Sequence, residues 1–261
     1  MIKKELVKKN FSKSTNSYDN FANVQKHMAK ELMKNLNDNL NEIKILEIGS
    51  GTGILTNYLI SKYPNSQITL IDISEPMIES CRNKFGNRLN YIVSDAENYE
   101  FENKFDLIIS NATFQWFNNL NETVEKYKNI LNENGKMLFS IFAEGTYKEL
   151  NESFLKVSEE YKYSQNFIDF EELKKIGKIL KEEYYMEEYK SLLEFLKSIK
   201  GIGAQSSLTN KKVLTPNIIK AVEKEYLASY KKILVSNSLA YVEVNWDEQS
   251  SFFYGKIYKS I

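Results

Sequence analysis

The sequence predicts an α/β fold with a mostly parallel sheet and helices on both of its faces. Short apolar strand candidates alternate with helix candidates through residues 44–142. A glycine-rich turn, ILEIGSGTG at 45–53, joins the first of these strands to the next helix. With 261 residues and a hydrophobic fraction of 42%, the chain can hold one large domain, or one domain with an inserted subdomain.

The elements are expected in the following order. Residues 1–40 read as polar and helical, with an amphipathic stretch at Val24, Met28, Leu32 and Leu36. Strands are predicted at 44–49, 67–73, 89–94, 105–110 and 136–142, and helices between them at 53–63, 75–84 and 119–132. Short strands separated by helices of these lengths indicate a parallel sheet that is covered on both faces.

The pattern changes after Phe142. Residues 147–200 are charged and rich in aromatic side chains, and they read as mostly helical with a strand near 183–189. A further helix is expected from Leu214, because Pro216 suits a first helical turn. The segments SLAYVEVNW and SSFFYGKIY alternate and are rich in strand formers, so they predict one or two closing strands, at least one of which joins the main sheet.

Charge and cysteine content limit the function classes. Lys and Arg number 35 against 35 Asp and Glu, so the chain has no overall attraction to nucleic acid. The one cysteine, Cys81, excludes an internal disulfide framework and fits a reducing compartment. The first residues contain no apolar stretch of the length of a signal peptide or a membrane span. We therefore expect a cytoplasmic protein.

The glycine turn differs from a dinucleotide fingerprint. That fingerprint needs a third small residue, and here the third position is Ile54. The pattern is instead E-x-G-x-G-x-G, formed by Glu47, Gly49, Gly51 and Gly53. An acid just before the first glycine suits a ligand that carries positive charge rather than an anion. Because Ile54 occupies the third position of the fingerprint, a nicotinamide oxidoreductase is the least favoured interpretation.

Polar residues follow the next three strands. Asp72 ends the second strand, where an acid can accept hydrogen bonds from both hydroxyls of a ribose. Asp95 and Ala96 end the third strand, where a carboxylate can accept from the exocyclic amine of an adenine. Asn111 ends the fourth strand beside the same crevice. Because open α/β sheets bind ligands at the carboxyl ends of their strands, these positions predict a nucleoside site.

Residues 40–145 resemble the class I S-adenosylmethionine-dependent methyltransferases. The resemblance implies a Rossmann-like, mostly parallel seven-stranded sheet with a helical lid inserted after the fifth strand. It also implies that the glycine loop meets the methionyl part of S-adenosylmethionine, with the ribose on Asp72 and the adenine beside Asp95 and Ala96. The implied cofactor-binding residues are Tyr18, Glu47, Gly49, Gly51, Gly53, Asp72, Ile73, Met77, Asp95, Ala96 and Asn111. For Met77, packing in the core is an equally good interpretation.

Four further segments resemble the malonyl-acyl-carrier-protein O-methyltransferases of biotin synthesis. They are SYDNFANVQKHMAKEL, SNATFQWFNNL, LFSIFAEGTYKEL and LLEFLKSIKGIGA. This resemblance implies that the free carboxylate of a malonyl thioester, on acyl carrier protein or coenzyme A, is esterified without a metal. The segment SIFAEGT departs from the more usual proline-containing turn, which puts details of the substrate pocket in doubt.

The implied chemistry needs no general base. A malonyl carboxylate is already ionised at neutral pH, so the only histidine, His27, and Cys81 are unnecessary for the reaction. A dry pocket that aligns the reactants suffices. Its aromatic walls are expected from Tyr18, Phe114, Trp116 and Tyr147, and its hydrogen-bond donors from Gln115 and Thr146. Phe114 and Trp116 are too close in sequence to point the same way, so one of them is expected in the core.

The same reading divides the chain into four parts. Residues 1–40 cover the cofactor site, and 41–146 form the cofactor-binding core. Residues 147–232 form a mostly helical lid and substrate region that includes part of the late core, and 233–261 supply closing strands of the sheet. An acidic carrier protein is expected to dock near Lys197, Lys200, Lys211 and Lys212, around the GIGA loop. A solvated lysine-rich face is an equally good interpretation of these lysines.

Two other functions fit the residues. One is a methyltransferase of a free small acid such as trans-aconitate, whose family has a similar N-A-x-x-Q-W element. The other is a non-catalytic regulator or assembly factor that keeps the glycine loop but transfers no methyl group. An assay of malonyl-carrier protein against free polycarboxylates separates these alternatives.

Overall fold

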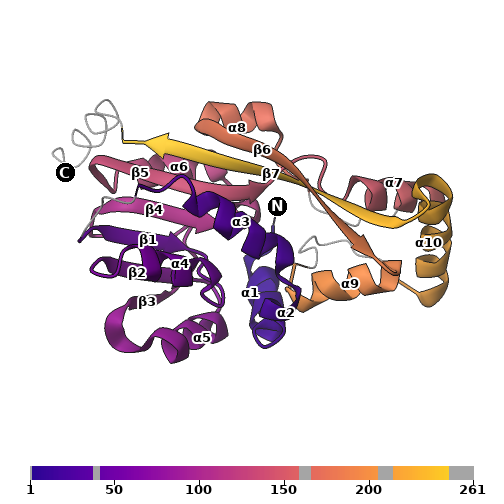
Figure 1. Ribbon diagram of the computed structural model, residues 1–261, viewed down its shortest axis with the longest axis horizontal. Coiled ribbons are helices and arrows are strands. Elements are labelled where there is room, and N and C mark those ends of the chain that lie inside the picture. Colours follow the sequence, from indigo (N-terminus) through magenta and orange to yellow (C-terminus); the bar gives the residue numbers. More distant parts are fainter. Residues whose placement is uncertain (1, 38–41, 159–165, 205–213, 247–261) are drawn as a thin grey trace.

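A computed structural model describes residues 2–37, 42–158, 166–204 and 214–246. Its centre is a seven-stranded sheet with the order β3-β2-β1-β4-β5-β7-β6 (Figure 1). The strands are β1 Lys44–Ile48, β2 Gln67–Asp72, β3 Asn90–Val93, β4 Phe105–Asn111, β5 Leu131–Phe142, β6 Lys178–Tyr189 and β7 Ile233–Asn245. This confirms the predicted α/β class and the seven-stranded, mostly parallel sheet.

Helices precede, separate and follow these strands. The N-terminal segment forms α1 Lys4–Ser14, α2 Tyr18–Phe21 and α3 Asn23–Met33. The crossovers are α4 Ile54–Lys62, α5 Glu75–Phe85 and α6 Leu120–Lys128, with short 3-10 turns η1 Gly86–Arg88 and η2 Phe114–Trp116. The later helices are α7 Lys148–Val157, α8 Phe170–Ile176, α9 Leu192–Gly201 and α10 Pro216–Tyr230. No helix within the described ranges is long and apolar enough to cross a membrane.

The first five strands are parallel, and their order reverses at β1. This strand pairs with β2 on one side and with β4 on the other, so Ile48 lies opposite both Ile71 and Ser110. The chain moves outward from β1 through β2 to β3, then crosses back to β4. The loops that follow β1 and β4 therefore diverge, which opens a crevice at the carboxyl end of the sheet.

The last two strands are antiparallel to their neighbours. β7 inserts between β5 and β6, with Phe139 opposite Val242. The expected strand near 183–189 begins earlier, at Lys178, and it forms the outer edge of the main sheet. Residues 147–232 are therefore not only a helical insertion. The predicted closing strand SLAYVEVNW lies in β7, whereas SSFFYGKIY lies outside the described residues.

The boundary between the helix predicted at 119–132 and the strand predicted at 136–142 also differs from the prediction. α6 ends at Lys128, and β5 already begins at Leu131. Asn134 then adopts a positive φ of 63°, and the pairing of β4 with β5 shifts between Phe105 and Leu107. Strand β5 is therefore irregular near its start. Its sequence there lacks the regular alternation of a strand, which is why the predicted boundary is wrong.

Three apolar clusters hold the molecule together. On one face of the sheet Leu32 of α3, Leu59 of α4 and Ile78 of α5 are fully buried. On the other face, Tyr127 of α6 and Leu173 of α8 are buried. A third cluster joins α7, α9 and α10 beyond the ends of β6 and β7 (Figure 1). Helices α7, α9 and α10 therefore share a small core of their own, to which the ends of β6 and β7 contribute.

Candidate active site

The three glycines of the turn after β1 have different roles. All three have positive φ, at 68°, 53° and 86° for Gly49, Gly51 and Gly53. A Cβ atom on Gly49 would lie 2.1 Å from Thr113 Oγ1, and one on Gly53 would lie 2.6 Å from the Phe85 ring. A Cβ on Gly51 would meet no described atom within 4 Å. Packing therefore explains Gly49 and Gly53, whereas the space beside Gly51 is left open.

A cavity lies at the carboxyl ends of the strands, under α1. The predicted cofactor and pocket residues that line it are Tyr18, Gly49, Gly51, Asp72, Ile73, Asp95, Ala96, Asn111 and Trp116. Glu47, Gly53 and Met77 do not line it, and Met77 is fully buried. Residues that the sequence reading did not single out are Lys4, Val7, Phe11, Ile71, Ala112, Thr113 and Phe117.

Asp72 ties the glycine turn to the second strand. Its Oδ2 accepts a hydrogen bond from the Gly51 backbone N–H at 2.9 Å, and its Oδ1 accepts from the Ser74 N–H at 2.8 Å. Burial raises the pKa of Asp72 to about 6, although these two bonds act in the opposite direction. Each carboxylate oxygen keeps a further lone pair, so Asp72 can accept two more hydrogen bonds from a ligand.

Glu47 lies behind the turn rather than in the cavity. Its side chain is buried, and its Oε2 accepts a hydrogen bond from Thr56 Oγ1 at 2.7 Å. Burial raises the pKa of Glu47 to about 8, with a smaller contribution from the charge of Asp72. The predicted acid is thus in place, but it is largely protonated at neutral pH.

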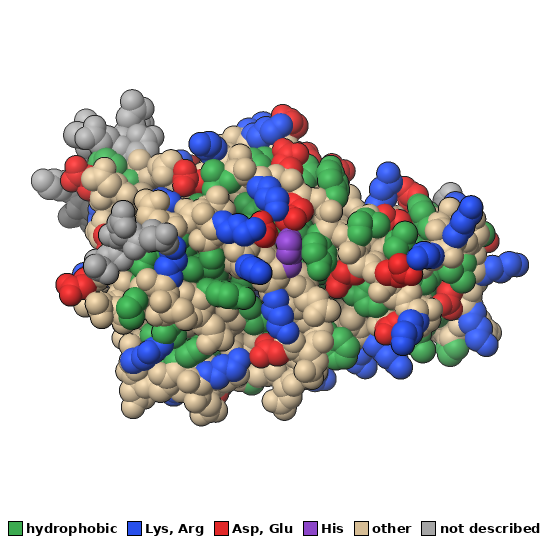
Figure 2. Space-filling view, in the orientation of Figure 1, with side chains coloured by type: hydrophobic (Ala, Val, Ile, Leu, Met, Phe, Trp, Pro, Cys, Tyr) green, Lys and Arg blue, Asp and Glu red, His purple; other side chains and the backbone are tan. Residues whose placement is uncertain are grey.

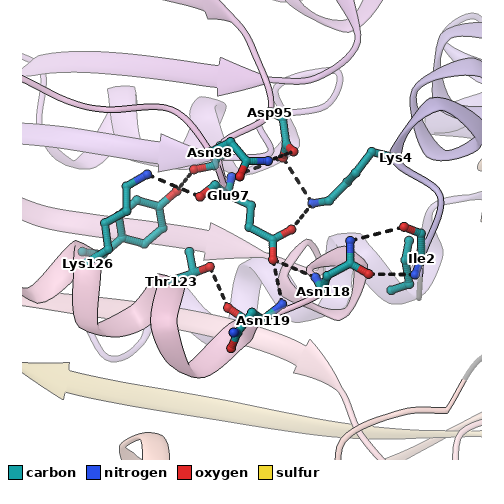
Figure 3. Close-up of polar contacts among 11 residues, drawn as sticks. Ile2, Lys4, Asp95, Glu97, Asn98, Asn118, Asn119, Thr123 and Lys126 are labelled. Carbon is teal, nitrogen blue, oxygen red and sulfur yellow. Dashed lines mark hydrogen bonds and ion pairs between the residues drawn. The ribbon is translucent and has the colours of Figure 1, made fainter.

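Ion pairs hold helix α1 to residues that follow β3 (Figure 3). Lys4 Nζ lies 3.2 Å from Asp95 Oδ1 and 2.6 Å from Glu97 Oε2. The other oxygen of Glu97 accepts from the backbone N–H groups of Asn118 and Asn119, at 2.8 and 2.7 Å. Glu97 therefore joins α1 to the loop before α6, and Asp95 shares its carboxylate with a lysine.

A second cavity adjoins the first. Both are lined by Phe11, Tyr18, Ala112 and Trp116, and the second extends to Ile202 and Ala204 after α9. No Lys, Arg, His, Asp or Glu from the described part of the chain lines it. Burial, with smaller contributions from the charges of Asp72 and Asp19, raises the pKa of Tyr18 well above its usual value. Its phenol is therefore a neutral hydrogen-bond donor.

The predicted donors and walls do not all face this second cavity. Gln115 lines it, and its Nε2 donates to the Ala112 carbonyl at 2.6 Å. Thr146 instead donates to the Ala143 carbonyl at 2.8 Å and lines a separate cavity beside α7. Phe114 is packed in the core, whereas Trp116 lines both cavities. This confirms that one of the two aromatic residues of the FQW segment is a core residue.

The only histidine and cysteine lie outside both cavities. His27 Nε2 is 3.0 Å from Glu183 Oε2, and its ring packs on Tyr185 with centroids 4.5 Å apart. The histidine is visible on the surface beside acidic and basic side chains (Figure 2). Cys81 is buried and donates to the Gly51 carbonyl at 3.2 Å, and burial raises the pKa of its thiol to about 12. Neither group lines a cavity in which it would act as a base.

Two of the four predicted docking lysines can be placed. Lys197 and Lys200 are exposed on α9, shortly before the Ile202 and Ala204 side chains that line the second cavity. Basic side chains recur over the end of the molecule formed by α9 and α10 (Figure 2). Lys211 and Lys212 lie outside the described residues.

Known proteins resemble this chain in sequence and in fold. Residues 45–135 match the family model described as a methyltransferase domain. Malonyl-(acyl-carrier protein) O-methyltransferase 2 of Ilyobacter polytropus is 43% identical over 93% of this chain and 98% of its own length. The malonyl-(acyl-carrier protein) O-methyltransferase of Acetivibrio thermocellus is 36% identical over 92% of this chain and 90% of its own length.

Two solved structures share the fold at low identity. The YcgJ protein of Bacillus subtilis has a TM-score of 0.60 at 13% identity, covering 85% of this chain and 99% of its own. The phosphoethanolamine N-methyltransferase 2 of Haemonchus contortus has a TM-score of 0.51 at 16% identity, covering 88% of this chain and 57% of its own. The extent and identity of the sequence matches, together with the seven-stranded fold, establish that the chain belongs to the family of malonyl-(acyl-carrier protein) O-methyltransferases.

Proposed function

We propose that this protein methylates the free carboxylate of a malonyl group carried on acyl carrier protein, in the early, pimeloyl-forming part of biotin synthesis. The observation that carries the proposal is the pair of adjoining cavities, which share four lining residues. One borders the glycine turn and the strand-end acids, and the other is uncharged and reaches toward exposed lysines. Relatives with this named activity match nearly the whole chain.

The cofactor is S-adenosylmethionine, and the first cavity fits it. The open space beside Gly51 accepts a ligand close to the backbone, and Asp72 retains acceptor capacity for ribose hydroxyls. Asp95, Ile73 and Ala96 line the same cavity, and we propose that Asp95 accepts from the adenine amine there. When bound, the cofactor supplies a methyl group on a positively charged sulfur.

The second cavity is the proposed acyl site. Its neutral donors, Tyr18 and Gln115, orient the acceptor group, while Trp116 and the neighbouring aromatic side chains exclude water. Alignment and exclusion of water are sufficient here because the nucleophile is already ionised. In this account α1–α3 cover the cofactor, residues 41–146 bind it, and 147–232 enclose the substrate.

The carrier protein is proposed to dock beside α9. Lys197 and Lys200 are exposed next to the end of the second cavity, so an acidic carrier bound there is positioned to deliver its acyl arm into that cavity.

A labelled-methyl assay tests this function. The full chain is incubated with methyl-labelled S-adenosylmethionine and, in parallel, with malonyl-carrier protein, malonyl-coenzyme A, trans-aconitate or no acceptor. We expect label on the malonyl carrier that mild alkali converts to volatile methanol, as the hydrolysis of a methyl ester does. Preferential labelling of trans-aconitate would assign a free-acid methyltransferase, and cofactor binding without transfer to any acceptor would assign a non-catalytic protein.

A further inference from the structure

One side chain of the second cavity has a buried oxygen with no hydrogen-bond partner among the described residues. Gln25, near the start of α3, is 6% exposed and lines the cavity. Its Oε1 is buried and accepts no hydrogen bond from the described part of the chain. Buried polar groups in folded proteins are almost always paired, because an unpaired one loses its bonds to water without replacement. This amide is therefore expected to find its partner in a ligand.

The backbone of Gln25 is fixed where the two cavities meet. Its carbonyl accepts a hydrogen bond from Asn111 Nδ2 at 3.0 Å, and Asn111 Oδ1 accepts from Ser140 Oγ at 2.7 Å. Asn111 lines the cofactor cavity, and the next residue, Ala112, lines both cavities. Gln25 is thus held beside the junction at which an acceptor group must lie to meet the cofactor.

The charge of this cavity indicates which group Gln25 contacts. A carboxylate loses its negative charge when it is esterified. A fixed cation would hold the unreacted carboxylate more strongly than the transition state, and so would slow the reaction. Neutral hydrogen-bond donors bind the unreacted carboxylate less strongly than a cation does, so they slow the reaction less. Among the described lining residues the polar side chains are tyrosines and glutamines, and none is charged.

We propose that the carboxamide of Gln25 binds the malonyl carboxylate and orients it for methylation. A half turn about the terminal side-chain torsion exchanges Oε1 and Nε2, which have nearly the same shape, so that the amide donates toward the carboxylate. The inference rests on the proposed function and adds to it a residue that determines specificity for a free carboxylate.

The test compares two carriers in the variant Gln25→Met, which keeps the length of the side chain and removes the amide. Malonyl-carrier protein is assayed as substrate, and acetyl-carrier protein, which lacks the carboxylate, as a competitive inhibitor. We expect affinity for the malonyl carrier to fall about tenfold and inhibition by the acetyl carrier to stay unchanged. Affinity for S-adenosylhomocysteine should also be unchanged. The Tm should equal or exceed that of the wild type, because the change removes an unpaired buried amide.

Gln67→Met is the matched control, since Gln67 is exposed at the start of β2. A second variant, Gln25→Glu, keeps the shape and places a carboxyl beside the malonyl carboxylate. Because burial raises the pKa of such a carboxyl, it is assayed at about pH 8.5, where its ionised form should cause a larger loss specific to the malonyl carrier. Unchanged affinity in both variants, or equal losses for the malonyl and acetyl carriers, would overturn the assignment. A wild type that binds cofactor without methylating malonyl-carrier protein would instead overturn the proposed function, and this role with it.

Discussion

Asp72 is the residue whose ionisation should control cofactor binding. The ribose hydroxyls need the carboxylate form, and the pKa of Asp72 is about 6 in the cofactor-free protein. Lowering the pH from 7.5 to 5 protonates most of this group, so affinity for S-adenosylhomocysteine should fall about tenfold. Isothermal titration at several pH values measures this change.

The variant Asp72→Asn provides the control. At pH 7.5 it removes charge-assisted hydrogen bonds of roughly 1.5–3 kcal/mol, so affinity should fall about tenfold to a hundredfold. At pH 5 the wild type and the variant should converge. A constant difference between them at all pH values would show that Asp72 does not titrate in this range.

Gly51 is expected to lie against the bound cofactor. Alanine there incurs roughly 1–2 kcal/mol of strain because φ is 53°, but its Cβ meets no described atom within 4 Å. Gly51→Ala should therefore stay folded and lose at least about tenfold in cofactor affinity. Gly86→Ala is the control for backbone strain: Gly86 has open surroundings away from the cavity, and its φ of 67° and ψ of −152° strain an alanine severely, so that variant should lose stability but keep its cofactor affinity. Similar cofactor affinity in the two variants would contradict the role of Gly51.

Residues at or just after the strand ends could be predicted from local pattern and fold class, since Asp72 and Asn111 end strands and Asp95 follows one closely. Tyr18, on α2, is implied by the family resemblance, whereas the sequence reading misses Lys4 and Gln25. Lys4 reaches Asp95 from 91 residues away, and its direction depends on how α1 packs. Gln25 occupies an apolar helix face, and only its burial without a partner distinguishes it.

At the scale of elements, α1 is expected to control the release of the cofactor. Lys4 holds this helix to Asp95 and Glu97 at the cavity (Figure 3). Lys4→Met removes a partly exposed pair of about 1 kcal/mol, so S-adenosylhomocysteine should dissociate about threefold to fivefold faster. Stopped-flow displacement measures that rate. Lys8→Met, an exposed change on the same helix, should leave the dissociation rate unchanged. An equal change of that rate in both variants would contradict the role of Lys4.

The element that the sequence reading described least well is β6. Its segment KILKEEYYMEEY carries many lysine and glutamate residues, which favour a helix in a local reading. In the fold it is an edge strand, where charged side chains remain solvated and prevent pairing with other chains. Its length and register come from pairing with β7, which lies about fifty residues later in the chain.

At the scale of the whole molecule, the end formed by α9 and α10 is expected to receive the carrier. The double variant Lys197→Glu with Lys200→Glu should raise the KM for malonyl-carrier protein about tenfold, with kcat unchanged and a weaker salt dependence. Lys174→Glu with Lys175→Glu, on α8, is the matched control. If the two double variants raised the KM equally, the net charge of the protein, and not the position of Lys197 and Lys200, would determine carrier binding.

In the proposed reaction, an ionised carboxylate accepts the methyl group without a general base. The most direct measurement is the single-turnover rate of methyl transfer to malonyl-carrier protein at saturating cofactor, from about pH 6.5 to 8.5. The account predicts a flat profile, because a carboxyl with a pKa near 4 does not titrate there. His27→Ala should follow the same profile, since His27 pairs with Glu183 outside both cavities. A rate that rises steeply through pH 7 and loses that rise in His27→Ala would contradict the account.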